Sequence, residues 1–449
     1  MPSHPGTTSD RAAALSAATP DDRDRYADLL RLYSITMVVL GHWVVALLTT
    51  HGSGSLTSSM PIMLSTWVWQ VMALFFFVGG FAHAHALRRR PSLGDFVRAR
   101  LGRLLPPAVV MLGVWAVVAA LLNAGGRRTG ELGTGLHKIT VPLWFLGVYL
   151  IIVLAAPPML RLHRRFGLLP VVGTLVAAAA GVDLLRFEIF TGSAATTVGY
   201  ANMLFVWLVV HQLGYGYADG TLVSGGRRLA GLLAGGGLTA TTLLVFGTGR
   251  YPVLMVGLPG NEVSNSSPPT LALLTQGFFL VGTALLLRPA GSAVASRPRA
   301  WLSIALGNSV IMTIFCWHLT ACYLVAGLLL VTGIGLPSVS TLWWLPVIAL
   351  WLIACTTACA GLVVVFRRFE RSGHRAEVGD RAAGAAVLCA GAGLFWISET
   401  GLEQLSWTNP APATAIALVT LAVLILRGRG TRPASAQPSD TPSSANRAR

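Results

Sequence analysis

A carboxylate, a guanidinium and an imidazole share one face of the first predicted membrane helix. Arg31 and His42 are 11 residues apart, which at 100° per residue is about 20° past three full turns. The rise of about 1.5 Å per residue places His42 roughly 16 Å from Arg31, near the middle of a hydrocarbon layer about 30 Å thick. Asp28 lies one turn before Arg31. We expect His42, with Asp28, to be catalytic, because a neutral imidazole can take a proton from a hydroxyl attacking an ester or thioester. The alternative is that Asp28 and Arg31 flank the interface and His42 hydrogen-bonds a neighbouring helix.

The segment 88–107 is strongly basic. It holds six arginines in its first sixteen residues and ends in Pro106 and Pro107. Arginines in such a segment contact lipid headgroups and set membrane topology, and they also hold phosphates through paired hydrogen bonds. We expect Arg100 and Arg103, beside a helix that begins at the two prolines, to bind an anionic ligand together with Arg31.

Other polar residues within or beside the apolar spans are weaker candidates. His83 and His85 are two residues apart and therefore point to different helix faces. His211 and His318 are candidates for function or for satisfied core groups, and we take His318, Trp144 and Glu262 as candidate substrate-binding residues. Trp144 also suits an aromatic belt. Glu262 lies in the longest predicted outer loop, residues 249–269, where turn-forming residues indicate an ordered loop.

The composition excludes a soluble globular protein. The 449 residues are 54% hydrophobic and 11% charged, the mean hydropathy is +0.66, and apolar runs of about 20 residues recur along the chain. A net charge of +16 would suggest nucleic-acid binding in a soluble protein. Here the arginines lie between apolar spans, so topology explains them and no nucleic-acid partner is expected.

The hydropathy pattern predicts an all-α polytopic membrane bundle of about twelve transmembrane helices. Their expected ranges are 29–49, 62–86, 104–122, 143–160, 169–185, 200–218, 228–246, 270–287, 302–325, 341–366, 382–398 and 412–427. Most of the 33 basic residues fall in alternate loops and in the two termini, which places both termini in the cytoplasm by the positive-inside rule. The expected location is the plasma membrane.

The composition also divides the chain. We expect a flexible cytoplasmic leader over 1–25, a ten-helix domain over 26–370, two additional helices over 371–428 and a disordered cytoplasmic tail over 429–449. The five cysteines lie in apolar spans without Cys-x-x-Cys spacing, which predicts no disulfide framework and no metal site.

Several motifs in order along the chain resemble one family. The pattern Asp28-x-x-Arg31, ten residues and His42 resembles the signature of the acyltransferase family 3 integral-membrane acyltransferases. Similar motifs follow: Phe75 to Phe81 (FFFVGGF), Arg100 to Pro106 (RLGRLLP), Pro142 to Leu146 (PLWFL), His211 to Tyr215 (HQLGY), Tyr251-Pro252 with Pro259-Gly260, and Trp317-His318-Leu319. The later motifs look like the family's actinobacterial branch. The likeness spans roughly 26–366. The family often has Ser-Gly-Phe where this chain has Gly79-Gly80-Phe81.

The resemblance implies transfer of an acyl group, commonly acetyl, from cytoplasmic acyl-CoA. The implied acceptor is a hydroxyl of an envelope carbohydrate, a lipid-linked sugar or a secondary metabolite, within a bilayer whose lipids the protein contacts. The resemblance also implies a catalytic role for His42 and a donor-side role for Arg31, in a stand-alone enzyme without a fused extracytoplasmic domain. Whether it forms a homodimer stays open.

As a hypothesis, the CoA phosphates bind Arg31, Arg100 and Arg103, and the pantetheine arm reaches His42, which acts as general base. A covalent acyl-histidine is the second variant. The alternative function is a twelve-helix secondary transporter, although the chain lacks a half-to-half repeat and a long central linker. A third interpretation, a structural or flippase-accessory protein, leaves the Arg31 and His42 face unexplained.

Overall fold

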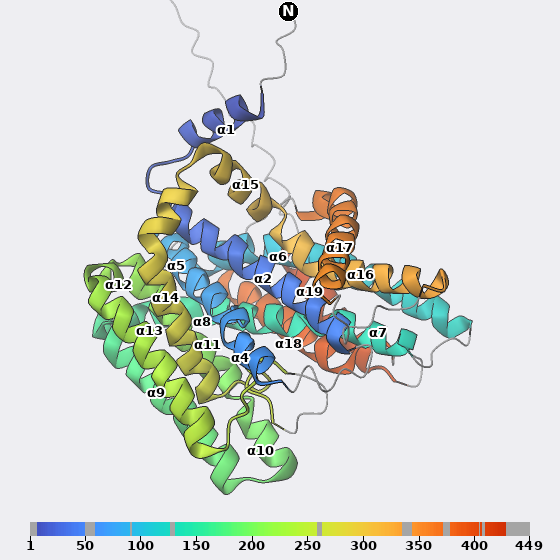
Figure 1. The fold of residues 1–449 in the computed structure, drawn as a ribbon. Helices are drawn as coiled ribbons and strands as arrows, with labels where there is room; N and C mark the ends of the chain where they lie inside the picture. The colour runs from blue at the N-terminus through green and yellow to red at the C-terminus, as the bar shows by residue number, and fades with distance from the viewer. Residues whose placement is uncertain are drawn as a thin grey trace, which may run out of the picture.

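The protein is a helical bundle in the computed structural model (Figure 1). The structure describes residues 7–49, 59–89, 92–125, 131–257, 263–334, 344–370, 378–403, 405 and 409–427. Over these ranges it consists of helices and their connections, with no β-strand. The predicted all-α class is confirmed.

The α-helices follow one another along the chain as follows. They are α1 (Thr8–Ala17), α2 (Arg25–Thr49), α4 (Met60–Trp69), α5 (Met72–Arg89), α6 (Leu93–Ala124), α7 (Glu131–Thr140), α8 (Leu143–Phe166), α9 (Leu168–Leu184), α10 (Gly192–Gly199), α11 (Asn202–Ala218), α12 (Thr221–Ser224), α13 (Gly226–Thr242), α14 (Leu271–Ala295), α15 (Pro298–Ser309), α16 (Ile311–Val331), α17 (Trp344–Phe366), α18 (Asp380–Thr400) and α19 (Ala411–Arg427). Single π-helical turns extend α9 and α13, and a 3₁₀ turn, Arg367–Glu370, follows α17.

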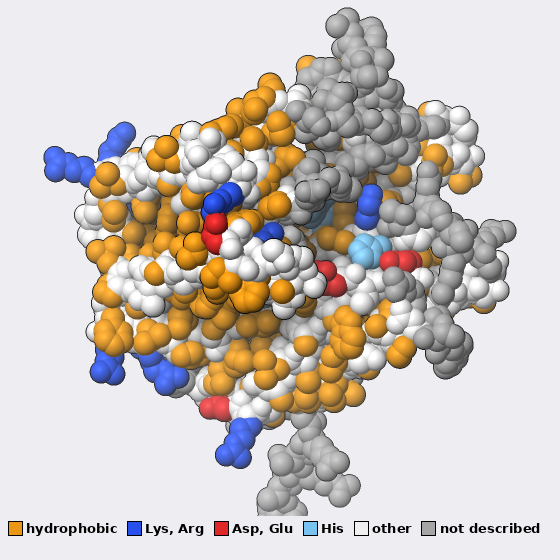
Figure 2. Space-filling model, turned by 90° about the horizontal axis from the view of Figure 1, so that it is seen from below, with side chains coloured by type: hydrophobic (Ala, Val, Ile, Leu, Met, Phe, Trp, Pro, Cys, Tyr) orange, Lys and Arg blue, Asp and Glu red, His pale blue; other side chains and the backbone are white. Residues whose placement is uncertain are grey.

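The bundle has the length and apolarity of a multi-pass membrane protein. Eleven spans in the described ranges are long and apolar enough to cross a bilayer, and a twelfth apolar helix, Ala411–Leu426, is shorter. Helices α1 and α15 lie at one end of the bundle and α10 lies at the other (Figure 1). The face at the α10 end is widely covered by apolar side chains, with few and scattered charged ones (Figure 2).

The third membrane helix begins earlier than the sequence indicates. We expected it over 104–122, with Pro106 and Pro107 in its first turn, but α6 starts at Leu93 and runs through both prolines. Ser92 caps it by accepting a hydrogen bond from the backbone N–H of Asp95 at 3.1 Å. The expectation was wrong because a side-chain cap can set a helix start about four turns before a proline pair. Arg100 and Arg103 therefore project from a helix and not from a loop.

The predicted helix 302–325 is two helices. It breaks at Val310 into α15, which packs against α1 and α2, and the membrane-spanning α16. The carboxylate of Glu370 accepts hydrogen bonds from the backbone N–H groups of Met312 and Thr313 at 3.1 and 3.0 Å. This cap for the start of α16 comes from 58 residues away, beyond the reach of local pattern reading.

Part of the expected flexible leader is ordered. Residues Thr8–Ala17 form α1, with a capping box between Thr7 and Asp10. The helix packs on α15, where the guanidinium groups of Arg23 and Arg25 lie 5.1 and 4.9 Å from the ring of Trp301. The predicted disordered tail, 429–449, lies outside the described residues.

Helices α5 and α11 cross at backbone contact in the centre of the bundle. A Cβ atom on Gly80 would lie 2.0 Å from the carbonyl oxygen of His211, and one on Gly214 would lie 2.1 Å from that of Phe77. Only glycine permits this approach. The contact fixes α5 against α11 and so fixes the histidines that the two helices carry.

Candidate active site

His42 on α2 and His318 on α16 form a hydrogen-bonded pair. Nδ1 of His42 lies 2.8 Å from Nε2 of His318. The ring centres are 5.0 Å apart and the ring planes differ by 15°, so the rings meet nearly edge to edge in one plane. His318 is buried and His42 is partly buried.

The contacts of His318 determine which nitrogen of His42 is free to act. Nδ1 of His318 lies 2.7 Å from the carbonyl oxygen of Phe315, and a carbonyl only accepts, so this nitrogen carries the proton. In the neutral ring Nε2 of His318 is then the acceptor, and Nδ1 of His42 donates to it. The neutral His42 ring consequently keeps a bare Nε2, which can accept a proton from another molecule.

Tryptophan side chains hold the two helices in register around this pair. The indole N–H of Trp43 donates to the carbonyl of His318 at 2.8 Å, and that of Trp351 donates to the carbonyl of Trp43 at 2.9 Å. On the other side of α16, the indole N–H of Trp115 donates to the Thr320 hydroxyl at 2.9 Å. These bonds fix the rotation of α16 about its own axis, which orients the His318 ring.

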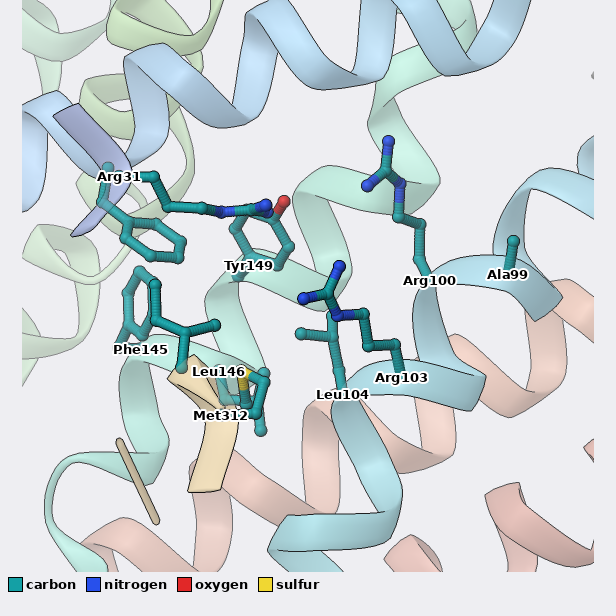
Figure 3. Close-up of a pocket in the computed structure, with 11 residues that line it drawn as sticks. Arg31, Ala99, Arg100, Arg103, Leu104, Phe145, Leu146, Tyr149 and Met312 are labelled. Atoms are coloured by element: carbon teal, nitrogen blue, oxygen red, sulfur yellow. The ribbon is translucent and has the colours of Figure 1, made fainter. Parts of the chain in front are cut away.

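Two neighbouring cavities that share lining residues lie toward the α1 end of α2. The wider one, about 370 Å³, is lined by Ala82, His85, Ala86, Arg89, Phe96, Ala99, Arg100 and Arg103. The narrower one, about 40 Å³, shares Ala99, Arg100 and Arg103 with it and adds Arg31, Phe75, Leu104, Phe145, Leu146, Tyr149, Ile311 and Met312. We call the narrower one the arginine pocket. The Arg31 guanidinium extends to the hydroxyl end of Tyr149, and the Arg103 guanidinium points into the same space (Figure 3).

The arginine pocket is rich in hydrogen-bond donors and positive charge. Arg103 donates to the carbonyl of Asn308 at 2.8 Å and Arg100 to that of Ala82 at 2.9 Å, bonds that place the side chains without neutralising them. Within the described part of the chain, the Arg31 guanidinium has no hydrogen-bond or ion-pair partner. An unneutralised guanidinium in a membrane protein is a strong indication of an anion site.

Aromatic side chains connect the arginine pocket to the histidine pair. The ring of Phe145, which lines the pocket, lies 5.6 Å from that of Phe315. The Phe315 ring lies 6.1 Å from the ring of His318. The pocket therefore approaches the histidine pair along α8 and α16, with the two phenylalanines between them.

The arrangement brings a hydrogen-bonded histidine pair and an arginine-lined pocket into one bundle. Groups of three or more His, Cys, Asp or Glu that could hold a metal ion do not occur among the described residues. The family described as an acyltransferase domain, acyltransferase family 3, matches residues 24–366. The chain belongs to this family. No curated protein and no solved structure matches the chain. The protein is accordingly a multi-pass membrane acyltransferase.

The matched region of the acyltransferase contains both cavities and the histidine pair, and α18 and α19 lie beyond it. The two helices still pack into the bundle, α18 against α8 and α6, and α19 against α18 and α6. At one crossing a Cβ atom on Gly147 would lie 2.9 Å from the carbonyl oxygen of Gly391. The helices that we expected as an addition therefore form one wall of the acyltransferase bundle.

The structure separates the residues proposed from sequence. Arg31, Arg100 and Arg103 meet in one pocket, and His318, expected on the substrate side, is the partner of His42. Asp28 does not join them: it forms an ion pair with Arg23 at 2.7 Å, and 14 residues along α2 place it about 21 Å from His42.

Trp144 lies in an aromatic cluster. Its ring lies 6.4 Å from that of Trp207, with the planes 29° apart, and Trp207 stacks on Phe76 at 4.6 Å. The described contacts of Trp144 are with other aromatic rings, and its role in substrate binding stays a prediction.

The loop over 249–269 is ordered where the structure describes it. The Tyr251 hydroxyl donates to the Asp183 carboxylate at 3.1 Å. Burial is the main cause that raises the pKa of Tyr251, and the negative charge of Asp183 raises it further. The carbonyl of Val253 accepts from the indole N–H of Trp67 at 2.7 Å, which ties the loop to α4. Glu262 lies outside the described residues.

Sequence reasoning missed Tyr149 and undervalued His83. The Tyr149 hydroxyl lies 3.0 Å from Nε2 of His83, and Nδ1 of His83 lies 3.0 Å from Nε2 of His211. A usable signal was present in the sequence, since His83 and His211 both lie in apolar spans, where a histidine needs a polar partner. The spacing of His83 and His85 on one helix could not reveal partners on α8 and α11.

Proposed function

We propose that the protein is an O-acyltransferase that moves an acyl group, acetyl in the simplest case, from cytoplasmic acyl-CoA to a hydroxyl. The acceptor is an envelope carbohydrate, a lipid-linked sugar or a secondary metabolite, and the site of action is the plasma membrane. The observation that carries the proposal is the hydrogen bond from His42 to His318, which leaves Nε2 of the neutral His42 ring without a proton, in a bundle that also holds a pocket lined by three arginines.

The donor binds from the α1 end, which faces the cytoplasm. The CoA phosphates bind across the wider cavity and the arginine pocket, against Arg31, Arg100 and Arg103, because guanidinium groups match phosphate oxygens in geometry and charge. The thioester arm continues from the arginine pocket toward His42. To reach His42, the arm displaces the rings of Phe145 and Phe315, which fill the space between.

His42 acts as general base on the acceptor hydroxyl. Nε2 takes the hydroxyl proton while the oxygen attacks the thioester carbonyl carbon, and the tetrahedral intermediate expels the CoA thiolate. The His42 imidazolium returns the proton to the thiolate, directly or through water, which gives the ester and free CoA thiol and restores neutral His42. His318 holds the His42 ring and stabilises its protonated form through the Nδ1 hydrogen bond, as the carboxylate of a catalytic triad does for its histidine.

The test is acyl transfer by the purified protein in lipid nanodiscs. Radiolabelled acetyl-CoA is supplied with an envelope extract of the producing cells, and free thiol and labelled product are both measured against empty nanodiscs. The proposal predicts thiol release that depends on the extract, with label recovered in an alkali-labile ester. Absence of transfer from acetyl-CoA and from longer acyl-CoA donors, with solute flux in proteoliposomes, would refute it in favour of a transporter.

A further inference from the structure

A buried chain of three side chains ends at the arginine pocket. Tyr149 on α8, His83 on α5 and His211 on α11 are joined by two hydrogen bonds of 3.0 Å. His83 and His211 have no exposed surface, and Tyr149 is 3% exposed. Tyr149 lines the arginine pocket, where its hydroxyl lies beside the Arg31 guanidinium (Figure 3). None of the steps proposed above uses this chain.

The far end of the chain is a buried nitrogen. Nδ1 of His211 has no hydrogen-bond partner among the described residues. Each neutral imidazole carries one proton, so the chain has two patterns. In the first, Tyr149 donates to His83, His83 donates to His211, and a buried N–H is left unpaired at Nδ1 of His211.

In the second pattern every bond is reversed. His211 donates from Nε2 to Nδ1 of His83, and His83 donates from Nε2 to the Tyr149 oxygen. Nδ1 of His211 is then a bare acceptor, and unsatisfied buried acceptors are more common in proteins than unsatisfied N–H groups. The Tyr149 hydroxyl proton is free to point into the arginine pocket.

An anion in the arginine pocket also favours the second pattern, because it acts at the Tyr149 end of the chain. Arg31 and Arg103 supply only donors, so a ligand held between them presents acceptor oxygens, and these also accept from a tyrosine hydroxyl. We propose that Tyr149 donates a hydrogen bond to a phosphate oxygen of the donor substrate in the arginine pocket, and that His83 and His211 position this hydroxyl. The assignment of the phosphate to acyl-CoA rests on the proposed function, whereas the Tyr149 contact to an anion does not.

The test compares ligands that differ in charge. Dissociation constants of CoA, inorganic pyrophosphate and uncharged acetyl-pantetheine are measured for the wild type and for Tyr149→Phe in nanodiscs. Because a hydrogen bond to a charged group is lost, Tyr149→Phe should raise the dissociation constants of CoA and pyrophosphate about tenfold. The dissociation constant of acetyl-pantetheine should not change. Tyr215→Phe is the matched control, since its hydroxyl is also buried and bonded, to the carbonyl of Ala156 at 2.9 Å, but does not line the pocket.

The positioning role of His83 has its own readout. His83→Gln should raise the dissociation constant of CoA by the same factor as Tyr149→Phe. The double variant should bind CoA as tightly as either single variant, because both changes remove the same interaction. In the wild type with CoA bound, histidine ¹⁵N spectra should show Nδ1 of His211 without a proton. Additive losses, or a proton on that nitrogen, would overturn the positioning role.

The outcomes separate this proposal from the function. If the wild type transfers acyl groups and Tyr149→Phe binds CoA with wild-type affinity, the Tyr149 assignment is wrong and the proposed function stands. If the wild type neither binds CoA nor transfers acyl groups, but Tyr149→Phe weakens the binding of pyrophosphate, the anion site stands. The assignment of acyl-CoA as the donor then fails. Failure of the wild type to bind either anion would overturn the Tyr149 assignment.

Discussion

Nδ1 of His42 and Nε2 of His318 lie 2.8 Å apart although 276 residues separate them in the chain. The bond gives His42 its tautomer, since Nδ1–H of His318 donates to the Phe315 carbonyl and leaves Nε2 of His318 as the acceptor. The same bond would stabilise an imidazolium on His42. The two effects make His318 the side chain on which the reactivity of His42 depends most directly.

Replacement of His318 by Leu should lower kcat about 100-fold or more, because His42 loses its tautomer and the partner of its charged form. Binding of CoA should change little. Initial rates and CoA affinity of the same preparation check this. His318→Gln, whose side-chain oxygen can still accept from Nδ1 of His42, should recover part of the rate; equal rates for the Leu and Gln variants would contradict the account.

Replacement of Arg31 by Met should act on donor binding. The guanidinium is unneutralised in the arginine pocket, so its loss should raise the KM for acetyl-CoA roughly 10- to 100-fold. Steady-state kinetics at constant ionic strength measure this. Arg165→Met, at the exposed end of α8, is the charge-matched control. A KM for Arg31→Met within twofold of the control would remove Arg31 from the donor site.

Gly80→Ala should destabilise the bundle. The new Cβ would lie 2.0 Å from the His211 carbonyl oxygen, so α5 and α11 must separate, at a cost of about 3 kcal/mol. Size-exclusion profiles after heating give the unfolding midpoint. Gly231→Ala on α13 is the control, because nothing lies within 4 Å of its Cβ, and it should raise the midpoint. A midpoint for Gly80→Ala at or above the wild type would show that the helices are less closely packed.

Asp380→Ala should loosen the contact between the C-terminal helices and α6. The Asp380 carboxylate accepts a hydrogen bond from the backbone N–H of Gly94 at 2.7 Å, at the start of the helix that carries Arg100 and Arg103. Loss of such a cap lowers the unfolding free energy by about 1 kcal/mol. Thermal unfolding in detergent tests this against Asp380→Asn, which keeps an acceptor oxygen. Indistinguishable midpoints for the two variants would mean that the bond contributes nothing.

The helical class and most spans follow from sequence because apolar stretches of about 20 residues have few alternatives in a bilayer. The boundaries that were wrong depend on side chains elsewhere: Ser92 starts α6 before its prolines, and Glu370 starts α16 from beyond α17. Hydropathy contains no signal for either cap.

The candidate site was predictable along one helix and not between helices. The 100° rotation per residue places Arg31 and His42 on one face of α2, and the structure keeps them there. The pairing of His42 with His318, and of His83 with His211 and Tyr149, depends on which helices pack together. That information lies in long-range packing, such as the crossing of Gly80 and Gly214.

The most direct test of the central claim is single-turnover acyl transfer by His42→Ala at saturating acetyl-CoA. CoA affinity is measured in the same nanodisc preparation. The histidine control is His137→Gln; His137 lies on α7, and its Nδ1 is 2.9 Å from the Glu403 carboxylate. The account predicts that His42→Ala binds CoA as the wild type does and transfers at least about 100-fold more slowly. Transfer by His42→Ala at the rate of His137→Gln would contradict a general base at His42.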